Sequence, residues 1–218
     1  PVYETGFNYG HNPGVFKTET GNPDPSAVSP GINFTNTLLL PLRFSSGKFH
    51  QFLQPSVSSV YNNNYIYVKK DSQYDYGQHQ LAGRIYFYNA HNSSMRDIYP
   101  RLAQVVDLNV SLYPWDKDFY GPSMSLQTAF FFPGFLPNNV LRIRYENEFL
   151  KPASYLKSNR IHLPRGYKNI ISEKIFFTSC DYIAPLAYPD ISAGSLLYLK
   201  RLRAGLFYDF ARATNNYY

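Results

Sequence analysis

Apolar and polar residues alternate with a period of two along most of this sequence, and this alternation constrains the fold more than any other feature. The segment 101–113 shows it most clearly. Its apolar positions are Leu102, Val106, Leu108, Val110 and Leu112, and the polar positions between them are Asp107, Asn109 and Ser111. Successive side chains of an extended chain point to opposite faces, whereas helical periodicity is almost absent here. The sequence therefore predicts an all-β protein of antiparallel strands.

Clusters of Asn, Gly, Ser, Pro and Asp interrupt the alternation and divide the chain into eight expected strands. Their expected ranges are 31–44, 49–61, 77–90, 101–113, 123–132, 139–149, 172–186 and 200–213. Residues 1–28 hold Gly-His-Asn-Pro-Gly and Gly-Asn-Pro-Asp-Pro and are predicted to be a long loop. Residues 29–218 are predicted to form the sheet, and 150–171 is the longest connection within it.

Two architectures fit these strands. A soluble β-sandwich uses strands of roughly five or six residues, whereas a membrane barrel needs roughly 9 to 11 residues for each crossing. The expected strands are long, and short connections alternate with longer ones, as in outer-membrane barrels. Aromatic residues make up 18% of the chain and gather near strand ends, where a barrel has its interfacial girdles. The pattern favours a transmembrane β-barrel, and the soluble sandwich is the alternative.

Composition narrows the classes of function. The 218 residues carry a net charge of +6, but only 17% of them are charged, which is weak support for a nucleic-acid groove. We expect no nucleic-acid partner. The single cysteine cannot form a disulfide within the chain.

Motifs for metal binding and catalysis are missing from the sequence. The five histidines are scattered: His11, His50, His79, His91 and His162. No zinc-type spacing, nucleophile elbow or phosphate-cradling glycine loop occurs. We therefore expect no metal, no cofactor, no catalytic residue and no enzymatic activity. A hydrolase that uses His79 or His162 with a nearby Ser or Asp is the enzymatic alternative.

Three short motifs follow one another near the end of the chain. They are Leu-Pro-Arg-Gly-Tyr at 163–167, Asp-Tyr-Ile-Ala-Pro at 181–185 and Phe-Tyr-Asp-Phe-Ala at 207–211. In order and spacing they resemble the BamA-type outer-membrane insertase and secretion-pore superfamily, the bacterial surface antigens. In that family a long outer loop folds into the barrel lumen and ends in an Arg-Gly-Phe/Tyr tip. The family's last motif is Phe-x-Asp-x-Gly, from which this chain departs at Ala211.

The resemblance implies roles for individual residues. Arg165, Gly166 and Tyr167 would form the tip of an inward-folding loop at 150–171. Asp181 and Asp209 lie on the same side of their strands and would be the counter-charges of Arg165, because a guanidinium in a confined lumen needs a hydrogen-bonding partner. The alternation adds further lumen-lining residues: Arg142, Arg144, Glu146, Arg201 and Arg203.

The resemblance also implies a place and a task. The chain would supply about eight strands of a sixteen-stranded barrel in the bacterial outer membrane, as part of a longer polypeptide or with strands supplied from elsewhere. It would act in insertion or translocation of proteins. Its partners would be outer-membrane lipid and lipopolysaccharide, client outer-membrane or secreted proteins, and other subunits of an outer-membrane complex. The alternatives are a passive channel or accessory barrel with an anion-favouring lumen, and a soluble carbohydrate-binding β-sandwich.

Overall fold

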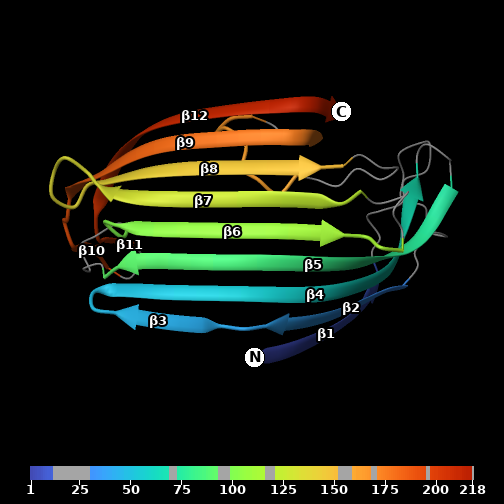
Figure 1. Cartoon of the computed structure of the whole chain (residues 1–218). Helices are drawn as coiled ribbons and strands as arrows, with labels where there is room; N and C mark the ends of the chain where they lie inside the picture. The colour runs from blue at the N-terminus through green and yellow to red at the C-terminus, as the bar shows by residue number, and fades with distance from the viewer. Residues whose placement is uncertain are drawn as a thin grey trace.

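The computed structural model of the chain describes residues 1–11, 30–68, 73–92, 99–115, 121–151, 159–167, 171–194 and 197–217. These residues form an all-β fold (Figure 1). The strands are β1 (Val2–His11), β2 (Pro30–Leu39), β3 (Leu42–Ser46), β4 (Phe49–Val68), β5 (Gln73–His91), β6 (Ala103–Leu112), β7 (Ser123–Pro133), β8 (Val140–Leu150), β9 (Ile171–Ala187), β10 (Ile191–Ala193), β11 (Leu197–Leu199) and β12 (Leu202–Tyr217).

Ten of these strands form one antiparallel sheet. Its order is β1-β2-β4-β5-β6-β7-β8-β9-β12, and β3 pairs with the other end of β4. The strands follow one another in the sheet in the order of the sequence, as in a meander, with β3 between β2 and β4 along the chain. The strands β10 and β11 form a separate two-stranded ribbon between β9 and β12, which the alternation did not predict. A sandwich needs two facing sheets, and the described residues contain no second sheet of that kind.

The prediction that residues 1–28 form a loop is wrong for residues 2–11. These residues form β1, which pairs with β2 from Val2 opposite Leu39 to His11 opposite Pro30. The signal was present, since Tyr3, Phe7 and Tyr9 occupy alternate positions. The glycine and proline clusters that suggested a loop fall mostly after this strand, and residues 12–29 lie outside the described part of the chain.

Two other boundaries differ from the prediction. The expected strand 31–44 is interrupted at Leu40 and Pro41, because proline has no backbone N–H to donate to the ladder. The expected connection between residues 61 and 77 is much shorter, because β4 continues to Val68 and pairs with β5 beyond an irregularity after Asn62. Tyr-Ile-Tyr-Val at 65–68 has high β propensity, which outweighs the asparagines before it.

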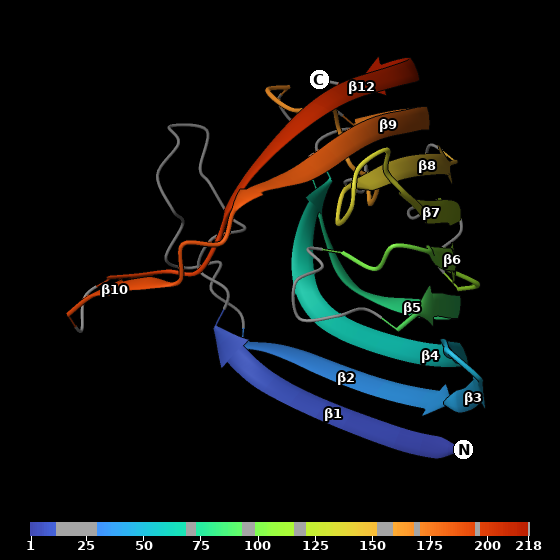
Figure 2. The same cartoon turned by 90° about the vertical axis from the view of Figure 1, so that its left-hand side faces the viewer.

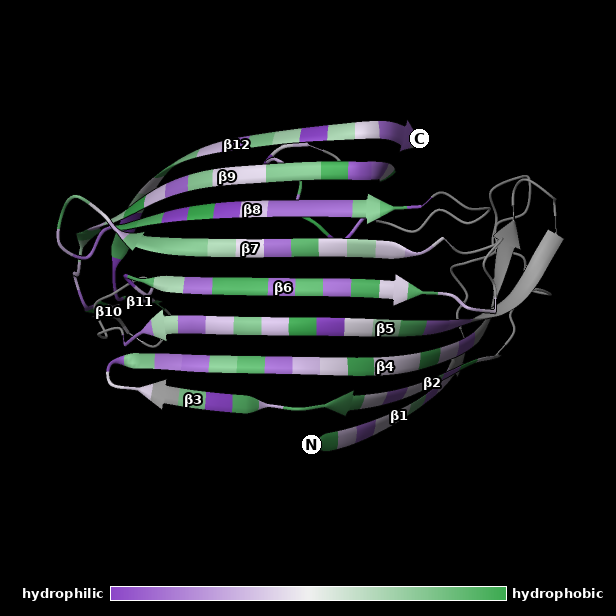
Figure 3. Cartoon of the chain, in the orientation of Figure 1, coloured by the Kyte–Doolittle hydropathy of each residue, from purple (hydrophilic) through white to green (hydrophobic). Residues whose placement is uncertain are grey.

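The sheet is curved (Figure 2), and its two faces differ in polarity. Residues 159–167, which we call the inner segment, lie on the concave side. Side chains that contact this segment or share its face are mostly polar: Thr37, Ser56, Arg84, Asp107, Gln127, Glu146 and Asp181. The convex face carries exposed apolar side chains: Phe7, Leu38, Val57, Ile85, Leu112, Met124, Ile143, Phe149, Leu206 and Phe210. Figure 3 shows this alternation along the strands.

The buried apolar residues form two small clusters on the concave side of the sheet. One joins Ala90, Ala103, Phe131 and Val140. The other joins Ile161 of the inner segment to Ile175 and Phe177 of β9. Within the described ranges, no helix has the length and hydropathy needed to cross a membrane.

The described sheet is open. Its edges are β1 and β12, and no described strand pairs these two edges with each other. Figure 2 shows them at opposite ends of the arc.

Candidate functional site

The inner segment and the strands beneath it hold the densest set of charged contacts among the described residues. The predicted inward loop 150–171 is described at residue 151, in the inner segment and at residue 171, and residues 152–158 and 168–170 lie outside the described ranges. The inner segment lies against β7, β8, β9 and β12, as its hydrogen bonds to Gln127, Glu146, Ser172 and Asp209 show.

Arg165 contacts both of its predicted counter-charges. One guanidinium nitrogen, Nη2, donates a hydrogen bond to Oδ1 of Asp181. Its Nε lies 3.6 Å from Oδ2 of Asp209, and its backbone N–H donates to the same oxygen at 3.1 Å. The guanidinium also stacks on the ring of Phe207, 3.9 Å from the ring centroid. The structure therefore brings Arg165, Asp181 and Asp209 together.

Asp181 accepts hydrogen bonds from more than one arginine. The register of β8 against β9 places Arg142 directly opposite it, and Arg142 donates from Nε at 3.1 Å and from Nη2 at 2.9 Å. Ser179 donates to the same oxygen at 3.1 Å, and Nε of Arg144 lies 3.9 Å away. Asp181 is only 3% exposed. A carboxylate buried this deeply is stable only with such charge-assisted partners.

Arg144 is less completely paired than Arg142. Its Nη2 donates to Oγ of Ser179 at 3.1 Å, and its guanidinium stacks on Phe177. Its Nε and the Oδ1 of Asp209 are both buried without a hydrogen-bond partner among the described residues. The site thus has one hydrogen-bond donor and one acceptor that no described residue pairs.

Two buried glutamates hold the backbone of the inner segment. Oε2 of Glu148 accepts from the N–H of Arg160 at 2.7 Å and from that of Ile161 at 3.3 Å. Oε2 of Glu146 accepts from the N–H of His162 at 2.9 Å, and the Nδ1 of the same histidine lies 2.8 Å from Oε1. Glu146 was predicted only to line a lumen, and Glu148 was not predicted at all. Both are 2% exposed.

A sequence signal for these glutamates exists. Four successive positions on the concave face of β8 are Arg142, Arg144, Glu146 and Glu148, a run of two cations followed by two anions. Such a run on a single face is costly to bury unless something pairs with it. In this structure Asp181 pairs with the arginines, and the backbone of the inner segment pairs with the glutamates.

Neutral contacts complete the attachment. Asn159 and Ser172 exchange two hydrogen bonds, from Nδ2 of Asn159 to the Ser172 carbonyl at 3.0 Å and from the Ser172 N–H to Oδ1 of Asn159 at 2.9 Å. Nε2 of Gln127 donates to the carbonyl of Arg160 at 3.0 Å. The chain from 159 to 162 is therefore held at every residue.

Gly166 and Tyr167 lie in a turn at the end of the inner segment. Gly166 has a φ of +87°, and Tyr167 donates its N–H to the carbonyl of Pro164 at 3.2 Å, which closes a tight turn. No atom of a described residue lies within 4 Å of the position where a Cβ would stand on Gly166, so its backbone does not approach the described part of the sheet closely. The ring of Tyr167 is exposed. Gly166 is therefore needed for its backbone angle.

The remaining predicted residues lie near β12. Arg201 precedes the strand and is partly buried. Arg203 lies at its start, on the concave side, and lines a cavity with Arg142, Arg165 and Asp181. The structure therefore brings Arg203 to the predicted cluster.

One ion pair elsewhere on the concave face was missed. Arg84 of β5 binds Asp107 of β6 with two hydrogen bonds, from Nε at 2.8 Å and from Nη2 at 2.6 Å. The alternation shows that both residues share a face, but their pairing depends on the register of two strands.

The four histidines whose side chains are described, His50, His79, His91 and His162, do not gather into a site. Nε2 of His79 lies 2.7 Å from Oγ of Ser59, and the imidazole stacks on Trp115 with centroids 4.3 Å apart. His162 binds Glu146 as described above, and His50 and His91 lie near the β3–β4 turn. The side chain of His11 lies outside the described set. The described residues include no group of three or more His, Cys, Asp or Glu able to hold a metal ion.

Comparison with known proteins adds no relative of this chain. No family model, no curated protein and no solved structure matches it.

Proposed function

We propose that this chain forms part of a bacterial outer-membrane β-barrel that acts in insertion or translocation of proteins. The observation that carries the proposal is the inner segment, attached by Arg165 to Asp181 and Asp209 on a polar concave face, behind a convex face that is exposed and apolar. These are the residues on which the resemblance to the BamA-type superfamily depends.

The convex face supports contact with lipid. Large apolar side chains that are exposed over many adjacent strands are rare on soluble monomers, and they mark an interaction surface. One hollow of about 750 Å³ on this face is lined mainly by apolar side chains from β2, β4, β5 and β6. Acyl chains would fill such a hollow. The main strands have ten residues or more, enough for a tilted crossing.

An aromatic cluster supports a membrane boundary at one end of the sheet. His79 stacks on Trp115 and meets Tyr61 edge to face at 6.4 Å. Trp115 is 64% exposed. Rings with one apolar body and one polar atom are enriched where a membrane meets water.

The two open edges support the proposal that other strands complete the barrel. A free edge in lipid leaves backbone N–H and C=O groups unsatisfied, at a cost of several kcal/mol each. In this proposal further strands pair with β1 and β12 and come from a longer polypeptide. Lipid and lipopolysaccharide would surround the barrel, and client proteins would add strands at an opened edge by β-augmentation.

A passive channel is the second candidate, because the concave face gathers Arg142, Arg144 and Arg203 close together. Such a group of cations would favour anions in a lumen.

The membrane proposal is tested on the native protein extracted in detergent and run on a denaturing gel with and without boiling. We expect the unboiled protein to migrate faster than the boiled one, because a closed barrel resists the detergent. A protein that stays soluble without detergent and migrates identically in both lanes would overturn the proposal.

The two functions are separated by reconstitution into liposomes. An insertase accelerates the folding of an added urea-denatured outer-membrane protein into those liposomes, and Arg165→Ala lowers that acceleration. A passive channel leaves the folding rate unchanged and conducts anions in preference to cations in a planar bilayer. If Arg165→Ala accelerates the folding of the added protein as much as the wild type does, the inner segment takes no part in the mechanism.

A further inference from the structure

A cavity of about 360 Å³ opens on the concave face beside the Arg165–Asp181 pair. Its charged lining consists of Arg142, Arg165, Arg203 and Asp181. Ligand pockets of this size are common in proteins, and they typically fix their ligand with a few converging polar groups.

The charges in this lining do not balance. Three arginines and one aspartate leave 3 − 1 = +2. Adding the next charges outward, Arg144 at 3.9 Å from Asp181 and Asp209 at 3.6 Å from Arg165, gives 4 − 2 = +2 again. The excess is therefore the same with or without these two outer charges.

Arg203 is the arginine of this cavity whose side chain is available to bind a ligand. Arg142 and Arg165 both donate to Asp181, whereas the Arg203 side chain is exposed and has no hydrogen bond or ion pair with any described residue. The pairing of β12 with β9 shifts register between Leu202 and Arg203. Such irregularities redirect side chains and commonly lie beside functional sites.

The other two guanidiniums are already oriented. Arg165 stacks on Phe207 at 3.9 Å, and Arg142 stacks on Tyr99 at 5.4 Å from the ring centroid. Phe207 and Tyr99 line the same cavity. A ligand that binds fixed guanidiniums loses less free energy to ordering them, which is the benefit of preorganisation.

We propose that this cavity binds a phosphate group. A phosphate monoester or inorganic phosphate carries close to two negative charges and several acceptor oxygens, which matches an excess of two positive charges presented by planar guanidinium forks. The ligand is either free phosphate or the phosphate of a lipid headgroup. This inference goes beyond the proposed function and does not depend on it, because it follows from the concave face alone.

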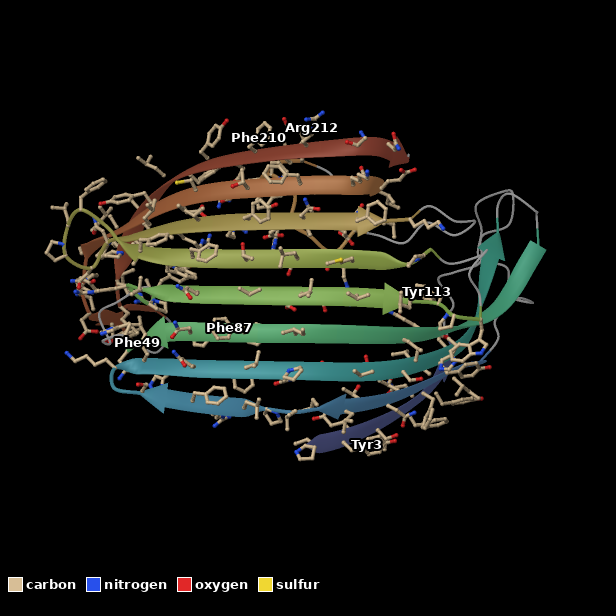
Figure 4. All side chains as sticks on the ribbon, viewed as in Figure 1. Tyr3, Phe49, Phe87, Tyr113, Phe210 and Arg212 are labelled. Carbon is tan, nitrogen blue, oxygen red and sulfur yellow. The ribbon has the colours of Figure 1, made fainter. Side chains whose placement is uncertain are left out.

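The test titrates inorganic phosphate into the purified full chain by calorimetry, in the detergent used for extraction. We expect saturable binding, weakened about tenfold in Arg203→Gln, because a hydrogen bond to a charged group contributes on the order of one such factor. Arg212→Gln is the matched control, since Arg212 lies on the same strand and points to the opposite face near Phe210 (Figure 4). Arg212→Gln is expected to bind phosphate as the wild type does.

A second arm identifies the source of the phosphate. Vesicles of phosphatidylcholine with phosphatidic acid displace bound inorganic phosphate if the site takes a lipid headgroup, and pure phosphatidylcholine vesicles do not. Displacement by neither vesicle supports free phosphate as the ligand. Acetate, with one negative charge, is expected to compete more weakly than sulfate, with two.

Three results would overturn the proposal: no saturable phosphate binding by the wild type, equal binding by wild type and Arg203→Gln, or equal losses in Arg203→Gln and Arg212→Gln. The boiled and unboiled gel lanes of Arg203→Gln keep this outcome separate from the proposed function. Loss of phosphate binding with an unchanged gel shift affects the cavity alone.

Discussion

The two halves of the sheet show the same alternation but differ in what covers their concave face. Over β8, β9 and β12 the inner segment covers that face, and charged residues there are almost fully buried: Glu146, Glu148 and Asp181. Over β2, β4 and β5 no described segment covers it. Thr37, Ser56 and Ser58 remain partly exposed there.

One ion pair in each half makes the difference concrete. The side chains of Arg84 and Asp107 are 47% and 16% exposed, whereas that of Asp181, beside Arg142, is 5% exposed. Water screens the first pair, so its contribution to stability is small. The second set is desolvated and strongly coupled, so removing one partner leaves an uncompensated buried charge. Burial beneath the inner segment thus determines how much a given ion pair contributes to stability.

The largest expected effect comes from Asp181→Ala, which leaves Arg142, Arg144 and Arg165 without their shared carboxylate. We expect a loss of about 3–5 kcal/mol in the free energy of unfolding. Asp107→Ala is the control and is expected to cost less than about 1 kcal/mol. Unfolding in urea measures the cost of both substitutions. It is monitored by the loss of the faster-migrating band of the unboiled protein. Equal losses of stability in Asp181→Ala and Asp107→Ala would show that burial beneath the inner segment does not strengthen the ion pairs.

Ile143→Arg tests the opposite face of the same half. If the convex face contacts lipid, an arginine near the middle of β8 destabilises the folded state by about 2–4 kcal/mol. On a surface in contact with water the same change costs within about 0.5 kcal/mol. Unfolding from liposomes measures the cost, and Ile143→Leu is the control. A negligible cost in liposomes would contradict the proposed lipid contact.

Glu148→Ala sharpens the comparison, because it weakens the attachment of the inner segment and leaves the contacts of Arg165 in place. The N–H groups of Arg160 and Ile161 lose their acceptor, at a cost of about 1–3 kcal/mol. We expect faster proteolytic cleavage within the inner segment. Glu4→Ala, at an exposed position on β1, serves as the comparison and should leave the cleavage rate unchanged. Unchanged cleavage in Glu148→Ala would mean that the other contacts suffice to hold the segment.

Gly166→Ala gives the smallest expected effect. Its φ of +87° disfavours any residue with a Cβ, and we expect a loss of about 1 kcal/mol. Gly83→Ala in β5 is the matched control, because it also has open space around a Cβ but no unusual backbone angle. That change is expected to be neutral or slightly stabilising. Thermal unfolding of both variants checks the difference, and equal stability would exclude backbone strain at the turn.

The strands were the most predictable part of the protein. β6, β7 and β8 end within two residues of their expected limits, because each alternates cleanly between turn-forming residues. β1 was missed although its aromatic residues alternate, since the glycines and prolines after it dominated the interpretation of the whole segment. The extension of β4 was missed for the same kind of reason. A loop signal and a strand signal overlapped, and only the pairing with β5 decides between them.

The candidate site was predictable in part. The order of three motifs pointed to Arg165, Asp181 and Asp209, and the structure brings their charged groups together. The role of Glu148 was not predicted, although its place in the Arg-x-Arg-x-Glu-x-Glu pattern of β8 was visible. The ion pair of Arg84 with Asp107 was not predictable, because a shift of two residues in register would keep both side chains on the same face but move them apart.

The sequence by itself determined the class of fold, the positions of most strands and the division of each strand into an apolar and a polar side. Local alternation suffices for this, because side-chain direction along an extended chain depends only on the parity of the position. The tertiary structure decided which polar residues are buried, which charges pair and where a positive excess remains. Those outcomes depend on register and on the fold of the inner segment over the sheet, which bring together residues far apart in the sequence, and no local pattern encodes such distances.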